Sequence, residues 1–152
     1  MARKIKIEIG SVSTVVVLLD QEAPKTCDRI WQALPLKGKL MHGSVTGREV
    51  FLPLFERLEI PPENQTIYPI EGDLVYYYKP YNYIDLEIPL ASRDIEVISL
   101  VYGRDTQMFG PVLPLPVNHF GVLESGQKDF VKEINSMRQC GFGTVSITKL
   151  KF

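Results

Sequence analysis

The stretch that most constrains the fold runs from Val15 to Leu34, with the sequence VVVLLDQEAPKTCDRIWQAL. It begins as a continuous β-branched and apolar run, which is typical of a strand in the middle of a sheet. Pro24 suits the first turn of a helix, where a missing N–H loses no partner. Apolar side chains then recur at helical spacing: Cys27, Ile30, Trp31 and Leu34. We expect this face, Trp31 included, to be buried, which requires a sheet for the helix to cover.

The rest of the chain consists mainly of predicted strands. Alternating or β-branched apolar patterns predict strands at 4–9, 14–19, 38–44, 48–54, 72–79, 95–102, 117–123 and 143–150. A second helix has Phe130, Ile134 and Met137 on one face. Residues 59–70 and 104–116 are rich in proline or polar residues and are predicted to be loops. About eight strands with two helices favour a mainly β fold, a closed barrel with no exposed edge, whose mouths the helices cover. We expect residues 1–152 to form a single domain.

Charge and hydropathy narrow the classes of partner. The chain has 17 basic and 18 acidic residues, a net charge of -1, so we expect no nucleic-acid or anionic-membrane surface. No apolar run is long enough for a membrane span and no secretion signal is present, which favours a cytoplasmic protein. Cys27 and Cys140 form no CxxC pair and have no zinc spacing, so they are predicted to be isolated thiols.

The segment with Pro24, Lys25, Thr26 and Trp31 resembles the strand–turn–helix of cyclophilins. In that family an apolar strand leads into a Pro-Lys-Thr helix start, and an aromatic residue follows along the helix. The later order of a strand hairpin, long loops, a late helix and a final strand is also similar. With GDLVYYY and a late GPV…NHFG stretch, the chain looks like the bacterial cyclophilin-like proteins of unknown function. The resemblance implies a cyclophilin-like barrel of about eight strands capped by two helices.

The chain departs from the isomerases of that family at the residues that do the chemistry. Those enzymes carry Phe-His-Arg on the strand after the first helix, and the arginine polarises the prolyl amide. Residues 40–44 instead read Leu-Met-His-Gly-Ser, and 48–54 read Arg-Glu-Val-Phe-Leu-Pro-Leu in place of the family's Gln-Gly-Gly-Asp-Phe stretch. A shared fold does not carry activity with it. We therefore expect no peptidyl-prolyl isomerase activity.

Both histidines are candidate site residues. His42 lies on the strand where cyclophilins place their working residues, and a hydrogen-bonding or proton-transferring role competes with that of a half-exposed strand histidine. His119 follows Asn118 after a proline-rich loop, a place where a rigid scaffold often presents binding groups. A His42–His119 metal pair would lack a third ligand of recognisable spacing, so no metal and no cofactor are predicted.

Four further residues could line a ligand site on the barrel face. Arg48 and Glu49 follow a glycine at a strand start, where they could orient a polar ligand, although a solvated hairpin end is the simpler explanation. Successive residues 76–78 are tyrosines and alternate faces, so either Tyr77 or its two neighbours must point outward or into a pocket. Phe109 could supply an aromatic wall on its loop.

Three hypotheses of function follow. The first is a protein that binds a small polar or carboxylate-bearing molecule at a face formed by His42, Arg48, Glu49, Tyr77, Phe109, Asn118 and His119. The second is an enzyme, either a degenerate prolyl isomerase or a hydrolase or isomerase that uses a histidine base. The third is a structural module, with the tyrosine-rich strand at the interface of a homo-oligomer.

Overall fold

The computed structural model describes residues 1–43, 46–79, 95–109, 114–125, 127–140 and 143–151. Within them the chain forms, in order, β1 (Lys4–Ile9), β2 (Val12–Leu18), α1 (Pro24–Ala33), β3 (Leu36–His42), β4 (Glu49–Pro53), β5 (Gln65–Thr66), β6 (Asp73–Lys79), β7 (Ile95–Val101), β8 (Val117–Ser125), α2 (Gln127–Cys140) and β9 (Gly143–Lys149). The predicted positions of the long strands and of both helices are confirmed to within a few residues.

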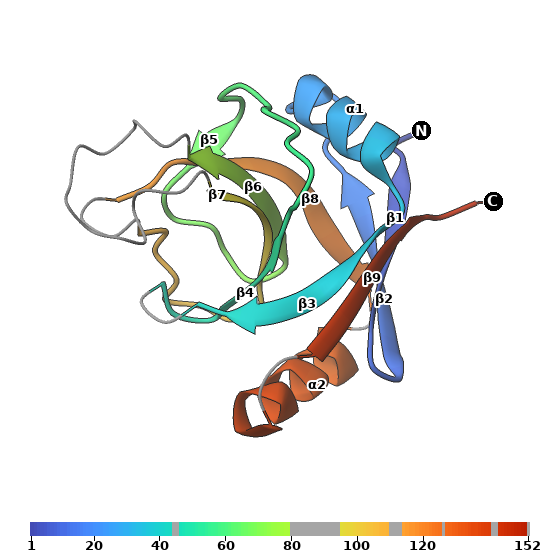
Figure 1. Ribbon diagram of the computed structural model, residues 1–152, viewed down its shortest axis with the longest axis vertical. Helices are drawn as coiled ribbons and strands as arrows, with labels where there is room; N and C mark the ends of the chain where they lie inside the picture. Colours follow the sequence, from blue (N-terminus) through green and yellow to red (C-terminus); the bar gives the residue numbers. More distant parts are fainter. Residues whose placement is uncertain (44–45, 80–94, 110–113, 126, 141–142, 152) are drawn as a thin grey trace.

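The strands close into a barrel (Figure 1). Neighbours follow the order β2-β1-β9-β3-β4-β7-β6-β8, every pair is antiparallel, and β2 pairs with β8 to close the ring. The short β5 pairs with β8 from outside the ring, within the predicted loop 59–70. The expected mainly β, cyclophilin-like barrel is therefore confirmed, with eight strands in the ring among the described residues. No helix in the described part of the chain is long and apolar enough to cross a membrane.

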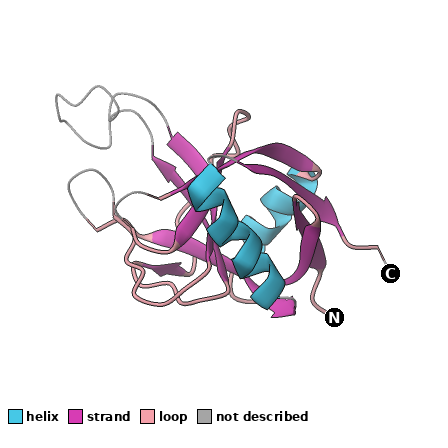
Figure 2. Ribbon diagram, turned by 90° about the horizontal axis from the view of Figure 1, so that it is seen from below, coloured by secondary structure: helices cyan, strands magenta, loops and turns pink. Residues whose placement is uncertain are grey.

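The helices lie at opposite ends of the barrel. Figure 1 shows α1 at the upper end and α2 at the lower end, and Figure 2, seen from below, shows α2 in front of the strands. Both helices bury apolar side chains in the main core: Cys27 and Ile30 from α1, and Phe130, Ile134 and Met137 from α2. The core thus fills the barrel between two helical caps, as the two apolar stripes predict.

Trp31 departs from the expectation that it would be buried on the face of α1. It is only partly buried and packs at the edge of the main core. Its ring lies between two cations, with the Arg3 guanidinium carbon 5.3 Å and Lys149 Nζ 5.1 Å from the ring centroid. The ring therefore joins both chain ends to α1 by cation–π contacts instead of filling the barrel.

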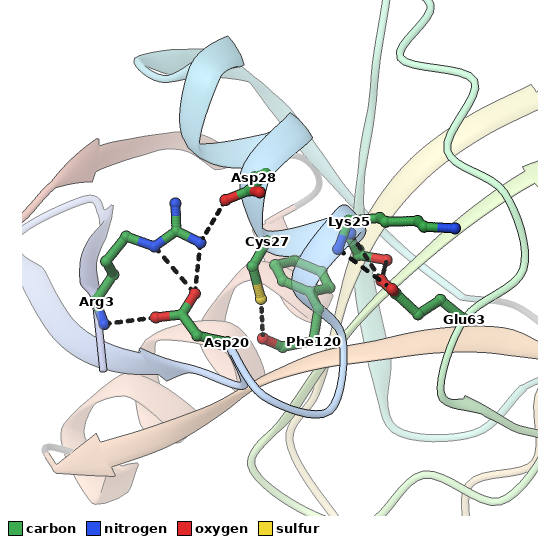
Figure 3. Close-up of polar contacts among 8 residues, drawn as sticks. Arg3, Asp20, Lys25, Cys27, Asp28, Glu63 and Phe120 are labelled. Atoms are coloured by element: carbon green, nitrogen blue, oxygen red, sulfur yellow. Dashed lines mark hydrogen bonds and ion pairs between the residues drawn. The ribbon is translucent and has the colours of Figure 1, made fainter. Parts of the chain in front are cut away.

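Cys27 is a core residue, as predicted for an isolated thiol. Its Sγ lies 3.4 Å from the Phe120 carbonyl oxygen, beside the ion pairs of Arg3 with Asp20 and Asp28 that tie the N-terminal segment to α1 (Figure 3). Burial raises the pKa of the Cys27 thiol to about 12, with a further contribution from the nearby Asp20 charge. Such a thiol is unreactive at neutral pH. The side chain of Cys140 lies outside the described residues.

A second, smaller apolar cluster lies on the outer face of the sheet. Val75, Met108 and Val117 form it, and Tyr77 packs against them. Met108 comes from the segment after β7, which crosses the outside of the barrel and covers the sheet there. The outer face of β4, β6, β7 and β8 is therefore partly shielded from solvent, which allows polar groups on it to be buried.

Candidate functional site

The structure distributes the predicted site residues over both faces of the sheet. His42 pairs with the core residue Val50 and so points inward, where its ring meets that of Tyr102 edge-on at a centroid distance of 5.9 Å. Glu49 and Tyr77 lie next to inward-facing residues on their strands and point outward. His119 pairs with the outward Val75. The two histidines therefore lie on opposite faces of the barrel wall.

Glu49 stands out among the buried carboxylates. Three acidic residues are buried in the described chain: Glu49 (4% exposed), Asp73 and Glu96. Glu96 accepts hydrogen bonds from the backbone N–H groups of Leu58 and Glu59, at 2.7 and 3.5 Å. Asp73 accepts one from the backbone N–H of Ile70, at 2.9 Å.

The described residues provide no comparable partner for the Glu49 carboxylate, neither a hydrogen-bond donor nor a cation within ion-pair distance. A carboxylate held out of water without a counter-charge is costly.

A second polar group without a partner lies beside Glu49. The Thr46 hydroxyl is buried, and no described residue forms a hydrogen bond with it. A Cβ atom added at Gly43 would stand 3.0 Å from Glu49 Oε2 and would overlap with Thr46 Oγ1. Thr46 Oγ1 therefore fills the space that a side chain at position 43 would occupy, and Glu49 Oε2 lies at the edge of the same space. A residue other than glycine at position 43 would push them apart.

Ser99 adds a third polar group to this surface. Its hydroxyl is buried and has no hydrogen-bond partner among the described residues. Ser99 pairs with Phe51, two residues from Glu49 on the same face of β4, so the two side chains are diagonal neighbours across the strand pair. We refer to Thr46, Glu49 and Ser99 as the outer-face cluster.

Tyr77 borders the outer-face cluster from β6. Burial, together with the nearby Glu49 charge, raises the pKa of its phenol to about 12. Tyr77 is therefore a neutral hydroxyl at physiological pH and lies within the electrostatic reach of Glu49. Its position resolves the ambiguity of the three tyrosines, because Tyr76 is buried in the main core and Tyr78 packs against that core.

The segment after β7 closes over the outer-face cluster. The Gln107 N–H donates to the Thr46 carbonyl oxygen at 3.1 Å, and the Met108 N–H donates to the Ile67 carbonyl oxygen at 2.9 Å. These bonds tie the segment to the turn before β4 and to the residue that follows β5. Phe109, at its end, is 38% exposed.

Arg48 lies at the rim of this region. It is exposed, and its side-chain stem occupies the space beside Gly103, where a Cβ atom would collide with it. The structure thus separates the two neighbours that the sequence suggested as a pair, because Arg48 faces solvent and Glu49 is buried.

His119 is paired with an acid instead of with His42. Its Nε2 lies 3.1 Å from Asp73 Oδ1, and the Asp73 side chain is 8% exposed. The two atoms are within ion-pair distance, but the contact does not have hydrogen-bond geometry, since His119 Nε2 is a buried atom without a hydrogen-bond partner among the described residues. No group of three or more histidine, cysteine or acidic residues suited to a metal ion occurs in the described ranges.

The side-chain amide of Asn118 forms hydrogen bonds only with groups of the protein itself. Its Nδ2 donates to Thr26 Oγ1 at 3.1 Å and to the Pro61 carbonyl oxygen at 2.9 Å, and its Oδ1 accepts from the Glu63 N–H at 3.1 Å and from Gln65 Nε2 at 3.4 Å. Asn118 is 3% exposed. Its role in ligand binding stays a prediction, while its role in joining α1, β8 and the segment 61–65 is visible in these bonds.

Glu63 forms hydrogen bonds with the start of α1, close to Asn118. Ala23 precedes α1 and cannot cap it with a side chain. Instead the Glu63 carboxylate accepts hydrogen bonds from the Lys25 N–H, the Thr26 N–H and Thr26 Oγ1, at 3.2, 2.8 and 2.8 Å (Figure 3). We refer to Thr26, Glu63 and Asn118 as the helix clamp. In it every polar group meets a partner within the protein.

Two members of the outer-face cluster were missed by the sequence reasoning, which identified Glu49 alone. Ser99 carried a usable signal, because it is the only small polar residue in the strongly apolar run IEVISLV. Thr46 carried none, since a threonine in a turn next to a glycine is ordinary. Its burial depends on a segment that lies about sixty residues later in the chain.

Sequence comparison assigns most of the chain to one family. Residues 5–149 match the model of a family described as a protein of unknown function, DUF3830. No curated protein matches the sequence.

Similar solved structures all show the same kind of barrel. McbB in complex with tryptophan superposes with a TM-score of 0.64 at 15% identity, covering 97% of this chain and 45% of that one, so this chain spans less than half the length of McbB. A hypothetical protein from Archaeoglobus fulgidus, AF2241, gives 0.55 at 19% identity and covers 98% and 95%. The Mimivirus cyclophilin gives 0.52 at 13% identity and covers 97% and 87%. At these identities the likeness establishes a cyclophilin-like fold.

Proposed function

This chain belongs to the DUF3830 family of unknown function, and we propose that it binds a small polar molecule at the outer-face cluster. The observation that carries the proposal is the pair of buried hydroxyls without hydrogen-bond partners at Thr46 and Ser99, next to the buried residue Glu49, whose carboxylate forms no hydrogen bond or ion pair with the described residues. A buried hydroxyl with no hydrogen bond costs about 1–3 kcal/mol relative to one that is satisfied. A fold that keeps two of them next to an unpaired carboxylate is arranged for a ligand that supplies the missing bonds.

The surrounding residues support a ligand of this kind. Tyr77 and Met108 offer apolar and aromatic surface around a few polar groups, which is the usual make-up of a small-molecule site. The exposed Arg48, next to Glu49 in the sequence, would pair with a carboxylate on the part of a ligand that is remote from Glu49. His42 and Asn118 are left out of this proposal because the first faces the core and the second is occupied by four hydrogen bonds.

Ligand screening by thermal shift and by two-dimensional NMR tests the proposal. Tryptophan is a reasonable first probe, because McbB was solved in complex with it, followed by small alcohols, amides, acids and amines. We expect at least one class to raise the melting temperature and to shift the amide signals of Thr46, Glu49 and Ser99. Thr46→Val should weaken that binding, whereas Asn135→Ala, an exposed change on α2, should leave it unaltered. Binding that is insensitive to Thr46→Val would contradict the proposal.

The proposal also holds that the chain lacks prolyl isomerase activity. Its support is the absence of the Phe-His-Arg motif, with Leu40, Met41 and His42 in the corresponding region and His42 turned inward. A protease-coupled prolyl-peptide assay should show no acceleration above the uncatalysed rate. Efficient turnover would overturn this part of the proposal.

A second candidate function rests on the contact between His119 and Asp73. A histidine close to a buried carboxylate is an arrangement in which an imidazole can serve as a general base, so a hydrolase or isomerase activity would use His119. The test is any turnover found during screening: it should be lost in both His119→Gln and Asp73→Asn while ligand binding is retained. Turnover that persists in both variants would exclude this role.

A further inference from the structure

We propose that the group bound at Glu49 is a protonated primary amine, so that the ligand is a small organic ammonium compound. This inference deepens the proposed function and rests on it, because it names the chemistry of the same site. The inference is based on the negative charge of Glu49, whereas the proposed function is based on the hydroxyls of Thr46 and Ser99 that have no hydrogen-bond partner in the described chain.

The negative charge of Glu49 determines which ligand groups can bind beside it. Glu49 is 4% exposed as a whole residue, and among the described residues no lysine, arginine or histidine lies within ion-pair distance of its carboxylate. A second anion brought to the same place would meet repulsion at low dielectric, and a neutral group would leave the charge uncompensated. A cation with N–H donors supplies both the counter-charge and a charge-assisted hydrogen bond.

The arrangement of acceptors favours an ammonium group over a planar cation. Thr46 Oγ1 and Glu49 Oε2 converge on the same side of Gly43 and can both accept hydrogen bonds. An ammonium group has three donors arranged around one compact nitrogen, which suits two acceptors from different side chains that lie on the same side of Gly43. A guanidinium group presents its donors as a flat fork and suits two parallel oxygens of a single carboxylate.

The other buried carboxylates show that this arrangement is specific to Glu49. Glu96 is equally buried but accepts backbone N–H donors from Leu58 and Glu59. Asp73 accepts the Ile70 N–H and faces His119. Both are balanced by the fold, so neither demands an external cation. Glu96→Gln therefore serves as a matched control for Glu49→Gln.

The experiment uses ligands that share a body and differ in one head group. Phenethylamine, 2-phenylethanol and 3-phenylpropionate are titrated into the full chain at pH 7, with propylamine, 1-propanol and propionate as a smaller series. Binding is followed by NMR at the amides of Gly43, Thr46 and Glu49. We expect an amine to bind at least about tenfold more tightly than its matched alcohol and acid, since a hydrogen bond between charged groups contributes about 1.5–3 kcal/mol.

Variants test whether the preference for amines comes from Glu49. Glu49→Gln should weaken amine binding at least about tenfold and leave alcohol binding within about twofold, whereas Glu96→Gln should leave the amine preference intact. Thr46→Val, which keeps the carboxylate, should weaken amine binding by a smaller factor and serves as the second variant if Glu49→Gln is poorly folded.

The outcomes separate this inference from the proposed function. Binding of alcohols or acids at these amides without a preference for amines would overturn the ammonium assignment and leave the proposed function standing. Absence of binding for all three head groups in both series would count against both. An amine preference that survives Glu49→Gln would also overturn the assignment.

Discussion

The helix clamp and the outer-face cluster are built from the same residue types and differ in how their polar groups are satisfied. Each contains a buried threonine and a glutamate: Thr26 with Glu63 in the clamp, and Thr46 with Glu49 in the cluster. In the clamp the threonine hydroxyl both donates to Glu63 and accepts from Asn118. In the cluster the threonine hydroxyl has no partner in the described chain.

The comparison separates polar groups that stabilise the fold from polar groups that are available to bind a ligand. Buried polar groups that are satisfied hold elements together, and their loss destabilises the fold. Buried polar groups that are not satisfied reduce stability, and a fold retains them at sites where a ligand or a reaction uses them. The clamp therefore acts as part of the scaffold, and the cluster is the place at which we propose that a ligand binds.

The largest effect is expected in the clamp. Asn118→Ala removes four hydrogen bonds that join α1, β8 and the segment 61–65, and it leaves Thr26 Oγ1 and the Pro61 carbonyl oxygen without their donor. We expect the free energy of unfolding to fall by about 3–4 kcal/mol. Denaturant unfolding measures it, with exposed Asn135→Ala as the control that should stay near wild type. A loss below about 1 kcal/mol would show that the clamp is not structural.

Isosteric changes at two buried acids, Glu49 of the cluster and Glu96, which the fold satisfies in the way that the clamp is satisfied, should have different effects on stability. Glu96→Gln turns an acceptor-only carboxylate into an amide that presents N–H donors toward the Leu58 and Glu59 N–H groups, so we expect a loss of about 2 kcal/mol. Glu49→Gln removes an unpaired buried charge, so the ligand-free protein should be unchanged or more stable. Urea titrations of both variants, run side by side, check this. A comparable loss in both would remove the distinction between the two acids.

A smaller effect is expected from the pH dependence of the clamp. Burial alone raises the pKa of the Glu63 carboxyl, but the hydrogen bonds from Thr26 and Lys25 outweigh it and hold the pKa below its usual value. The charged form thus stabilises the fold above the ordinary carboxyl pKa, and this contribution disappears as the pH falls through the lowered value.

Glu63→Gln should therefore reduce stability by about 1 kcal/mol at pH 7, the usual value of a lost helix cap, and the difference from wild type should shrink toward pH 2. Thermal unfolding between pH 7 and pH 2 measures this. A difference that stays constant over that range would mean that the charge on Glu63 does not contribute.

The smallest effect is expected at Ser99. Ser99→Ala removes a buried hydroxyl without a partner and leaves a residue of similar size between Val75 and Phe51. The ligand-free protein should gain up to about 1 kcal/mol in unfolding free energy. Destabilisation by this change would indicate that the hydroxyl is satisfied in solution.

The fold was predictable because its pattern is local. The alternation of Ile5, Ile7 and Ile9, the tyrosine-rich strand and the helix that starts at Pro24 each identify an element from adjacent residues. Closure of the barrel followed from the number of strands. Trp31 was placed wrongly because its cationic partners, Arg3 and Lys149, come from the two ends of the chain.

The candidate site was predictable only in part, because burial and pairing are long-range properties. Glu49 and Tyr77 were identified by residue type and position, but the sequence alone could not show that Glu49 is buried without a partner among the described residues. Asn118 and His42 were also candidates, and the structure places the first among four hydrogen bonds and the second toward the core. Which polar group meets which depends on the register of strands that are far apart in the sequence.

The most direct test of the difference between the two regions is a comparison of Thr26→Val with Thr46→Val by denaturant unfolding of the ligand-free protein. Both changes replace a buried hydroxyl by a methyl group of similar shape. We predict that Thr26→Val lowers the free energy of unfolding by about 2 kcal/mol, because Asn118 and Glu63 lose their shared partner, and that Thr46→Val raises it by up to about 1 kcal/mol. A loss of similar size in both variants would contradict the account.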